Sequence, residues 1–228
     1  MHRLRRFIFL LSILSLVFLC SDARTESSTG KESRFVNSPK FILYIPSGIE
    51  TYKKYPIVVA LSPGADAESM VAIWKNVSEK YKWIILASKE FRNGVDMNPV
   101  FSSIVSTLDF LSMNFPVDDS KVIVTGFSGG GMGSHFFSFL HPRIVSAVVI
   151  NTGMMHQFQR EKKYSCPRSK LAVFLASPTD FRYSEMKRDR MFLNDLGWKT
   201  KWIEFQGGHR IAPQSAYEKA AEWLNKQF

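Results

Sequence analysis

The sequence predicts an α/β fold with a mostly parallel sheet and helices on both of its faces. The first observation is that, along residues 40–228, short apolar runs of strand length alternate with longer mixed segments of helical character. The second is that several runs, such as Ile57–Leu61, are apolar at every position. Uninterrupted runs of this kind are typical of central parallel strands that are covered on both faces.

The individual elements follow from these runs in chain order. The expected strands are rich in Val, Ile, Leu, Phe and Ala, and the first two are separated by a loop from Pro46 to Pro56, where Ser47 and Gly48 favour a turn. Strands are expected at Phe41–Ile45, Ile57–Leu61, Trp83–Ala87, Lys121–Gly126, Ala147–Asn151, Leu171–Ala176 and Lys201–Phe205. Helices are expected at about Ala67–Tyr81, Pro99–Asn114, Gly130–Leu140, Tyr183–Leu196 and Pro213–Phe228. Ligands of parallel sheets bind beyond the carboxyl ends of the strands, so the residues that follow each strand are the first candidates for a site.

Length and composition bound the class of protein. With 228 residues, 45% of them hydrophobic, the chain corresponds to one folded domain rather than to a disordered or fibrous protein. Its two cysteines, Cys20 and Cys166, are too few for a disulfide scaffold and lack the spacing of a zinc finger. The formal net charge of +10 would attract polyanions. No basic helix or RNA-binding aromatic motif accompanies that charge, so no nucleic-acid partner is expected.

Residues 1–23 have the three parts of a secretory signal peptide: a basic start, an apolar run from Phe7 to Cys20, and a small-residue exit that ends at Ala23. Three outcomes are open: cleavage after Ala23, lipidation of Cys20 as in a bacterial lipoprotein, and retention as a membrane anchor. All three export the body of the protein, which is then secreted or periplasmic, or attached to the cell envelope through a lipid on Cys20. Residues 24–34 are expected to form a flexible tether, and residues 35–228 a single domain.

The residues from Gly126 to Gly130 form the pattern G-x-S-x-G between an expected strand and an expected helix. This context is typical of a nucleophile elbow, a turn so tight that both outer positions must be glycine while the central Ser128 hydroxyl is exposed. The backbone N–H of Gly129 then lies at a helix N-terminus, where it would face a developing oxyanion. The alternative, a phosphate-binding turn, is disfavoured because neither G-K-[ST] nor G-x-G-x-x-G is present.

A serine nucleophile needs a base, and the base needs a carboxylate that orients it. His209 follows the strand expected at Lys201–Phe205 and is the preferred base, while Asp180 follows the strand expected at Leu171–Ala176 and is the preferred carboxylate. Asp189 and Asp195 are weaker candidates because they are expected on the following helix. The remaining histidines form no metal-binding pattern, so neither a metal nor a cofactor is expected. Of these, His135 and His141 are expected to be structural, whereas a place for His156 in the pocket stays open.

A second oxyanion donor is expected from the loop that follows the strand Ile57–Leu61. Pro63 has no N–H and cannot donate, so the donor must be the backbone N–H of Gly64 or that of Ala65.

At this point the chain resembles the secreted α/β-hydrolases of the esterase type, namely the group of polyhydroxybutyrate depolymerases, feruloyl esterases and phospholipase/carboxylesterases. The resemblance covers most of residues 39–228, and the elbow is one of its specific parts. The other segments that carry it are Tyr44-Ile45-Pro46, Tyr55-Pro56-Ile57-Val58-Val59-Ala60-Leu61, Val117-Asp118, His141-Pro142 and Gly207-Gly208-His209. It implies an α/β-hydrolase fold in which Ser128 is the nucleophile, Asp180 the acid and His209 the base. The sequence departs from this group at Ser62-Pro63, where His-Gly is usual, so the oxyanion loop is expected to be altered.

The resemblance also implies a substrate class, the carboxylic esters. The segment Gly153–Lys170 is too short for a large lid, which favours an open cleft and allows a polymeric ester as substrate. Two alternatives stay open: a non-catalytic, envelope-attached binding protein that kept the fold, and a peptidase or acyltransferase with the same triad. Specificity is expected to depend on the loops Phe91–Met97 and Met154–Lys163, and Cys166 is expected in an exposed loop; the oligomeric state stays open.

Overall fold

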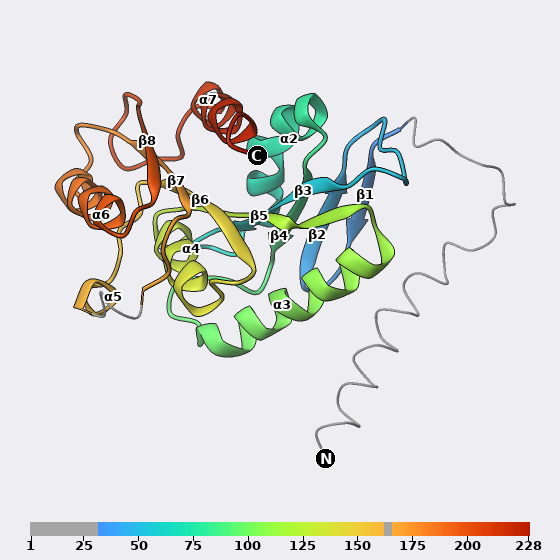
Figure 1. Cartoon of the computed structure of the whole chain (residues 1–228), viewed down its shortest axis with the longest axis horizontal. Coiled ribbons are helices and arrows are strands. Elements are labelled where there is room, and N and C mark those ends of the chain that lie inside the picture. Colours follow the sequence, from blue (N-terminus) through green and yellow to red (C-terminus); the bar gives the residue numbers. More distant parts are fainter. Residues whose placement is uncertain (1–31, 162–165) are drawn as a thin grey trace, which may run out of the picture.

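The computed structural model describes residues 32–161 and 166–228 of the chain (Figure 1). The expected signal segment 1–23, its Cys20 and the first part of the expected tether lie outside the described residues. No helix within the two described ranges is long and apolar enough to span a bilayer.

One eight-stranded sheet forms the centre of the molecule, in the spatial order β1-β2-β4-β3-β5-β6-β7-β8. The two strands at one edge, β1 and β2, pair antiparallel, and β2 is also antiparallel to β4, whereas every pair from β4 to β8 is parallel. The strands are β1 (Arg34–Asn37), β2 (Phe41–Ile45), β3 (Tyr55–Leu61), β4 (Ile84–Ser88), β5 (Val117–Phe127), β6 (Val145–Asn151), β7 (Leu171–Ala176) and β8 (Lys199–Glu204). The predicted mostly parallel sheet is therefore confirmed.

Helices cover both faces of this sheet, as Figure 1 shows. The helices are α2 (Ala67–Tyr81), α3 (Met97–Asn114), α4 (Gly129–Leu140), α5 (Gln157–Glu161), α6 (Tyr183–Asp195) and α7 (Gln214–Asn225). Apolar residues of α2 and α7 share one buried cluster with one face of the strands, and those of α3, α4 and α6 share a second cluster with the other face. Central strands such as β3 are buried on both faces, which explains why their sequences are apolar at every position.

The first strand was not predicted. β1 is short and mostly exposed at the sheet edge, so its sequence carries no strong apolar pattern. Because β1 begins at Arg34, the expected tether extends one residue too far.

The strand that leads to Ser128 is longer than predicted. β5 begins at Val117, which pairs with Tyr55, and the register shifts before Val122. Asp118 and Asp119 therefore lie inside the strand rather than ahead of it. The Asp118 carboxylate nevertheless accepts the backbone N–H of Ser120 at 3.1 Å, the local turn contact that disfavours a strand in the sequence.

The expectation that Cys166 lies in an exposed loop is wrong, because its side chain is buried. The thiol contacts the backbone oxygen of Gln159 at 3.4 Å, and burial raises its pKa. Gln159 lies in α5, a short helix that the sequence did not predict. Cys166 thus lies against a residue of this helix, and its polar neighbours in the sequence do not indicate that its side chain is buried.

Candidate active site

Ser128 lies where the sheet meets α4, at the carboxyl end of the central strand β5. Its φ of 52° and ψ of −115° are rarely adopted by a residue other than glycine, and its own N–H is held by the backbone oxygen of Asn151 at 2.9 Å. A Cβ atom on Gly126 would approach the Gly130 backbone to 2.3 Å, and one on Gly130 would approach the Leu61 backbone oxygen to 2.0 Å. The two outer glycines thus allow the strand end, the turn and the helix to pack together, which is the geometry of a nucleophile elbow.

The structure brings Ser128, His209 and Asp180 into one chain of hydrogen bonds. The Nε2 atom of His209 lies 2.8 Å from Ser128 Oγ, and its Nδ1 atom lies 2.7 Å from Asp180 Oδ2. An ionised carboxylate only accepts, so Nδ1 carries the proton toward Asp180 and leaves Nε2 to accept the Ser128 hydroxyl. The Asp180 side chain has no solvent exposure, and its other oxygen accepts the backbone N–H of Arg182 at 2.7 Å. Its two oxygens therefore have fixed partners, and the imidazole is held in one orientation.

The loop that carries His209 is shaped by the two preceding glycines. Gly207 and Gly208 both adopt positive φ, 128° and 70°, which explains their presence before His209. The Gly208 N–H donates to Ser177 Oγ at 2.9 Å, and Ser177 directly follows β7. This bond attaches the loop to the segment that also carries Asp180.

Asn151, at the end of β6, is a site residue that the sequence analysis missed. Its side-chain oxygen accepts the Ala212 N–H at 2.8 Å and the Tyr217 hydroxyl at 2.9 Å, and its side-chain nitrogen lies 3.4 Å from the Arg210 backbone oxygen. Asn151 thereby holds the main chain just after His209 while its own backbone holds Ser128. It follows an apolar strand like several other polar residues, so no local pattern distinguishes it.

Two aromatic rings flank the imidazole of His209. The ring of Phe127 lies 5.3 Å and that of Phe181 4.6 Å from the His209 ring, centroid to centroid. Phe181 is 70% exposed, so it screens His209 from solvent on its outer side without being part of the core. Both rings are tilted to the imidazole, by 42° and 38°, and contact it from neighbouring segments.

The expected oxyanion donors lie around the elbow in two groups. Gly129 is the first residue of α4, where the helix leaves N–H groups unpaired until Met132, whose N–H reaches the Ser128 oxygen at 3.0 Å. In the other loop, the Gly64 N–H makes only a 3.4 Å contact with Ser62 Oγ, and the Ala65 N–H a 3.3 Å contact with the Ser62 backbone oxygen. Neither contact is strong, so the structure does not choose between the two amides, and the second donor stays a prediction.

A cavity of about 410 Å³ lies beside the elbow. Its apolar wall includes Phe91, Val95, Met97, Met132 and Phe136; its polar lining includes Arg92, Asn93, His156 and Arg182; and glycines 94, 129 and 133 complete it. Most of the expected specificity loop Phe91–Met97 lines it, whereas the loop Met154–Lys163 contributes only His156 to this lining. Asn93 lies against the elbow itself, since a Cβ on Gly129 would lie 1.8 Å from its Oδ1 atom.

Arg182 is the second residue that the sequence analysis missed. Its Nη1 atom lies 3.4 Å from Ser128 Oγ and 3.5 Å from the Thr152 backbone oxygen. Its guanidinium carbon lies 5.2 Å from the centre of the Phe181 ring. A single arginine forms no recognisable motif, so only its position two residues after Asp180 could have indicated that Arg182 lies near the site.

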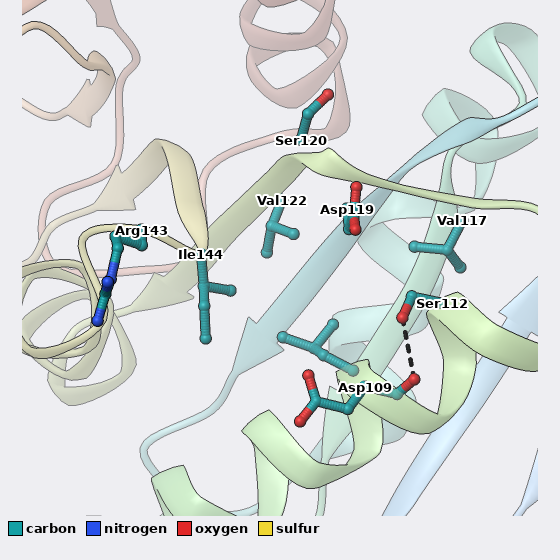
Figure 2. Close-up of a pocket in the computed structure, with 9 residues that line it drawn as sticks. Asp109, Ser112, Val117, Asp119, Ser120, Val122, Arg143 and Ile144 are labelled. Atoms are coloured by element: carbon teal, nitrogen blue, oxygen red, sulfur yellow. Dashed lines mark hydrogen bonds between the residues drawn. The ribbon is translucent and has the colours of Figure 1, made fainter.

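A separate cavity, of about 370 Å³, lies at the opposite end of the sheet (Figure 2). It is lined by the start of β5 and by Arg143 and Ile144 just before β6, with Asp109 and Ser112 contributed by α3. Because Val117 and Val122 precede Ser128 along the same strand, this cavity is remote from the elbow. It contains none of the expected site residues.

The other sequence candidates lie away from Ser128 or serve the fold. His135 is fully buried in α4 with no hydrogen-bond partner on either ring nitrogen, and burial lowers its pKa to about 3. Asp189 is buried in α6, pairs with Arg160 and accepts the Met155 N–H at 2.8 Å. Desolvation raises the pKa of Asp189 to about 6. His141 caps the C-terminal end of α4.

Among the described residues, no group of three or more His, Cys, Asp or Glu side chains is arranged to hold a metal ion. The groups that the structure places at the elbow are the Ser128 hydroxyl, the His209 imidazole, the Asp180 carboxylate and the Arg182 guanidinium.

The sheet order, the elbow at the end of β5 and the position of Asp180 and His209 after β7 and β8 define the α/β-hydrolase fold. No protein-family model and no curated sequence matches the chain. Solved structures with the same fold include a thermostable esterase, with 18% identity and a TM-score of 0.63 over 85% of this chain and 62% of that one. They also include the fluorophosphonate-binding serine hydrolase F of Staphylococcus aureus, with 12% identity and a TM-score of 0.64 over 84% and 96% of the two chains.

An acylaminoacyl peptidase is similar as well, with 15% identity and a TM-score of 0.58 over 86% of this chain and 41% of the peptidase. The chain thus spans less than two thirds of the thermostable esterase and of the peptidase. At these identities the comparisons establish the fold, which esterases and peptidases share.

Proposed function

We propose that the protein is a serine hydrolase that cleaves carboxylic esters through an acyl-enzyme, with Ser128, His209 and Asp180 as its catalytic triad. The observation that carries this proposal is the continuous hydrogen-bonded chain from Ser128 Oγ through both nitrogens of His209 to Asp180. The strained backbone of Ser128 supports it, because such strain persists where it holds a reactive group in position.

In acylation, the Ser128 oxygen bonds to the ester carbonyl carbon while its proton moves to His209 Nε2. The electron pair of the carbonyl π bond moves onto the oxygen, which the Gly129 N–H and an N–H of the Gly64–Ala65 loop stabilise. Asp180 stabilises the imidazolium that results. The C–O bond to the alcohol then breaks, and His209 Nε2 gives its proton to the departing oxygen.

In deacylation, water replaces the alcohol. It gives a proton to His209 Nε2 as its oxygen bonds to the acyl carbon, and the tetrahedral intermediate again places its charge at the oxyanion site. Breaking the bond between Ser128 Oγ and carbon returns the proton from Nε2 to Ser128 and releases the carboxylic acid. The cycle consumes one water and leaves the triad unchanged.

A peptidase or an acyltransferase would use the same groups, since they differ only in the leaving group or in the second nucleophile. Esters are favoured as the proposed substrates because the compared structures with this fold include an esterase and because the sequence motifs resemble those of hydrolases of the esterase type. The non-catalytic alternative predicts a triad that does not react with an electrophile.

The test compares purified wild-type protein with Ser128→Ala on p-nitrophenyl butyrate, with a fluorophosphonate probe as a second readout. We expect the wild type to hydrolyse the ester and to be labelled at Ser128, and the variant to lose at least about 10³-fold in rate. Equal rates for the two proteins would exclude Ser128 as the nucleophile. An unlabelled, inactive wild type would favour the binding-protein alternative. Peptide anilide and acyl-transfer assays in parallel then separate the reaction types.

We also propose that the protein is exported through the segment 1–23. The mass of the mature protein separates the three outcomes: a chain that begins at Arg24 supports cleavage, a lipid on Cys20 supports attachment to the envelope, and an intact start supports an anchor. Recovery of the uncleaved protein in the cytoplasmic fraction would contradict export.

A further inference from the structure

We infer that the substrate of this site is an anionic ester, whose acyl group carries a carboxylate that binds Arg182 and Arg92 in the cavity beside Ser128. This inference rests on the proposed function and specifies its substrate class.

The side chains that line the cavity carry positive charge. Two arginines and one histidine contribute to its lining, and no Asp or Glu of the described residues does. The side chain of neither Arg92 nor Arg182 forms an ion pair with a carboxylate in the described part of the chain. The lining of the cavity is therefore positively charged, which attracts an anion. The Asp180 carboxylate lies outside this lining and is engaged by His209 Nδ1 and by the Arg182 backbone N–H.

The guanidinium of Arg182 has few partners in the fold. The guanidinium is partly buried, its two contacts through Nη1 are long at 3.4 and 3.5 Å, and its Nε atom is buried without a hydrogen-bond partner. A cation withdrawn from water without an anionic partner is unfavourable, so a ligand carboxylate would supply what the fold does not. The Phe181 ring, 5.2 Å from the guanidinium carbon, limits its movement and so presents it to the cavity.

The position of the cavity places the anion on the acyl part of the ester rather than on the alcohol. The departing alcohol must lie at His209, which gives it a proton, and His209 does not line the cavity. Gly129, whose N–H is expected to hold the oxyanion, does line it. The acyl chain, which stays bonded to Ser128 with its carbonyl oxygen at Gly129, therefore extends into this cavity. Its methylene groups would contact the apolar wall at Met97, Met132 and Phe136.

The test compares monoethyl glutarate with ethyl valerate, two esters whose acyl chains have the same length and differ in a terminal carboxylate or methyl group. Product formation is followed by NMR, and the measured quantity is the ratio of kcat/KM for the two esters. We expect the wild type to prefer monoethyl glutarate by at least about tenfold, and added salt to reduce this preference. A ratio of one or less would overturn the inference.

The variants Arg182→Met and Arg92→Gln are each expected to lower the ratio by about tenfold, mainly through a higher KM for monoethyl glutarate. Arg182→Lys, which keeps the charge, should restore part of it. Arg143→Gln removes the same charge in the remote cavity of Figure 2 and should leave the ratio unchanged. If Arg182→Met slowed both esters equally, Arg182 would serve the oxyanion and not the substrate carboxylate, and the inference would be wrong.

Failure of the proposed function gives a different result. If the wild type cleaves no ester and Ser128 is not labelled, catalysis fails, but the anion site is still testable by titrating glutarate into Ser128→Ala and observing binding by NMR. Binding that Arg182→Met abolishes in that background supports the inference, and absence of binding overturns it.

Discussion

The backbone oxygen of Asn151 accepts the N–H of Ser128 at 2.9 Å, so the end of β6 holds the nucleophile in place. The side chain of the same residue holds the chain beyond His209 through the Ala212 N–H and the Tyr217 hydroxyl. One fully buried residue therefore couples the positions of two members of the proposed triad, which come from elements 81 residues apart. Asn151 is a positioning residue, since it acts on the triad through the backbone.

Replacing the Asn151 side chain should loosen the His209 loop more than the elbow. In Asn151→Ala the buried N–H of Ala212 and hydroxyl of Tyr217 both lose their acceptor, so we expect the free energy of unfolding to fall by about 2–4 kcal/mol. We expect kcat to fall by about 10- to 100-fold with a small change in KM, because a displaced base slows chemistry rather than binding. Urea denaturation and steady-state kinetics measure the two effects.

Tyr217→Phe is the matched control, because it removes one donor to Asn151 and leaves the Ala212 contact. It should cost about 1 kcal/mol and reduce kcat less than Asn151→Ala does. Equal losses of kcat in both variants would show that the Tyr217 contact alone positions the loop.

The elbow should tolerate no side chain at Gly130. A Cβ there would lie 2.0 Å from the Leu61 backbone oxygen, which belongs to the buried strand β3 and cannot move away easily. We expect Gly130→Ala to destabilise the fold by at least about 3 kcal/mol and to abolish labelling of Ser128 by a fluorophosphonate. Gly64→Ala is the control for stability, since nothing lies within 4 Å of its Cβ position. A Gly130→Ala protein as stable as Gly64→Ala would contradict the close packing.

The fold was predictable because a strand that is buried on both faces is apolar at every position, and such runs are visible in the sequence. The run at β7 is apolar at every position and its bounds match the structure, whereas β1 is exposed and leaves no such record. The first part of β5 is polar and partly exposed, so the sequence did not predict that the strand begins at Val117. Sequence patterns thus report burial, and they fail where a strand is not buried.

The candidate site shows a similar limit: site residues with a local sequence pattern were predicted, and those that act through contacts distant in the sequence were not. Ser128 and His209 stand beside glycines whose spacing is required by backbone geometry, and Asp180 follows a clear strand, so local patterns predicted all three. Asn151 and Arg182 act through contacts with residues 23 to 66 positions away, which no local pattern encodes. The choice between Gly64 and Ala65 depends on where a substrate oxygen lies, and the chain alone does not define that point.

The buried His135 should be a cost to the fold rather than a benefit. Both ring nitrogens lack a hydrogen-bond partner, and an apolar side chain of similar size would leave no polar atom unsatisfied. We expect His135→Leu to raise the free energy of unfolding by about 1–2 kcal/mol at neutral pH. Urea denaturation measures this, and a destabilised variant would indicate that packing against Phe174, 6.0 Å away, outweighs the polar cost.

The same variant should change how stability depends on pH. The folded-state pKa of His135, about 3, lies below the ordinary 6.5, so the unfolded chain binds the proton more tightly. The contribution of His135 to wild-type stability therefore becomes more unfavourable as the pH drops below about 6.5, and the advantage of His135→Leu should grow by about 2 kcal/mol by pH 5. An advantage that is independent of pH would contradict the lowered pKa.

Asp189 should act in the opposite direction. Desolvation raises its folded-state pKa to about 6 from the ordinary 3.8, so the folded protein binds the proton more tightly than the unfolded chain does. Its contribution to stability is fully present below about pH 3.8 and is lost as the pH rises through 6. Between about pH 4.5 and pH 7.5 the wild type should lose about 2 kcal/mol relative to Asp189→Asn, which does not titrate there. Asp109→Asn, which changes an exposed carboxylate of α3, is the control for a general charge effect. If the stability of the wild type relative to Asp189→Asn instead rose between pH 4.5 and pH 7.5, the ion pair with Arg160 would be keeping Asp189 ionised in the folded protein.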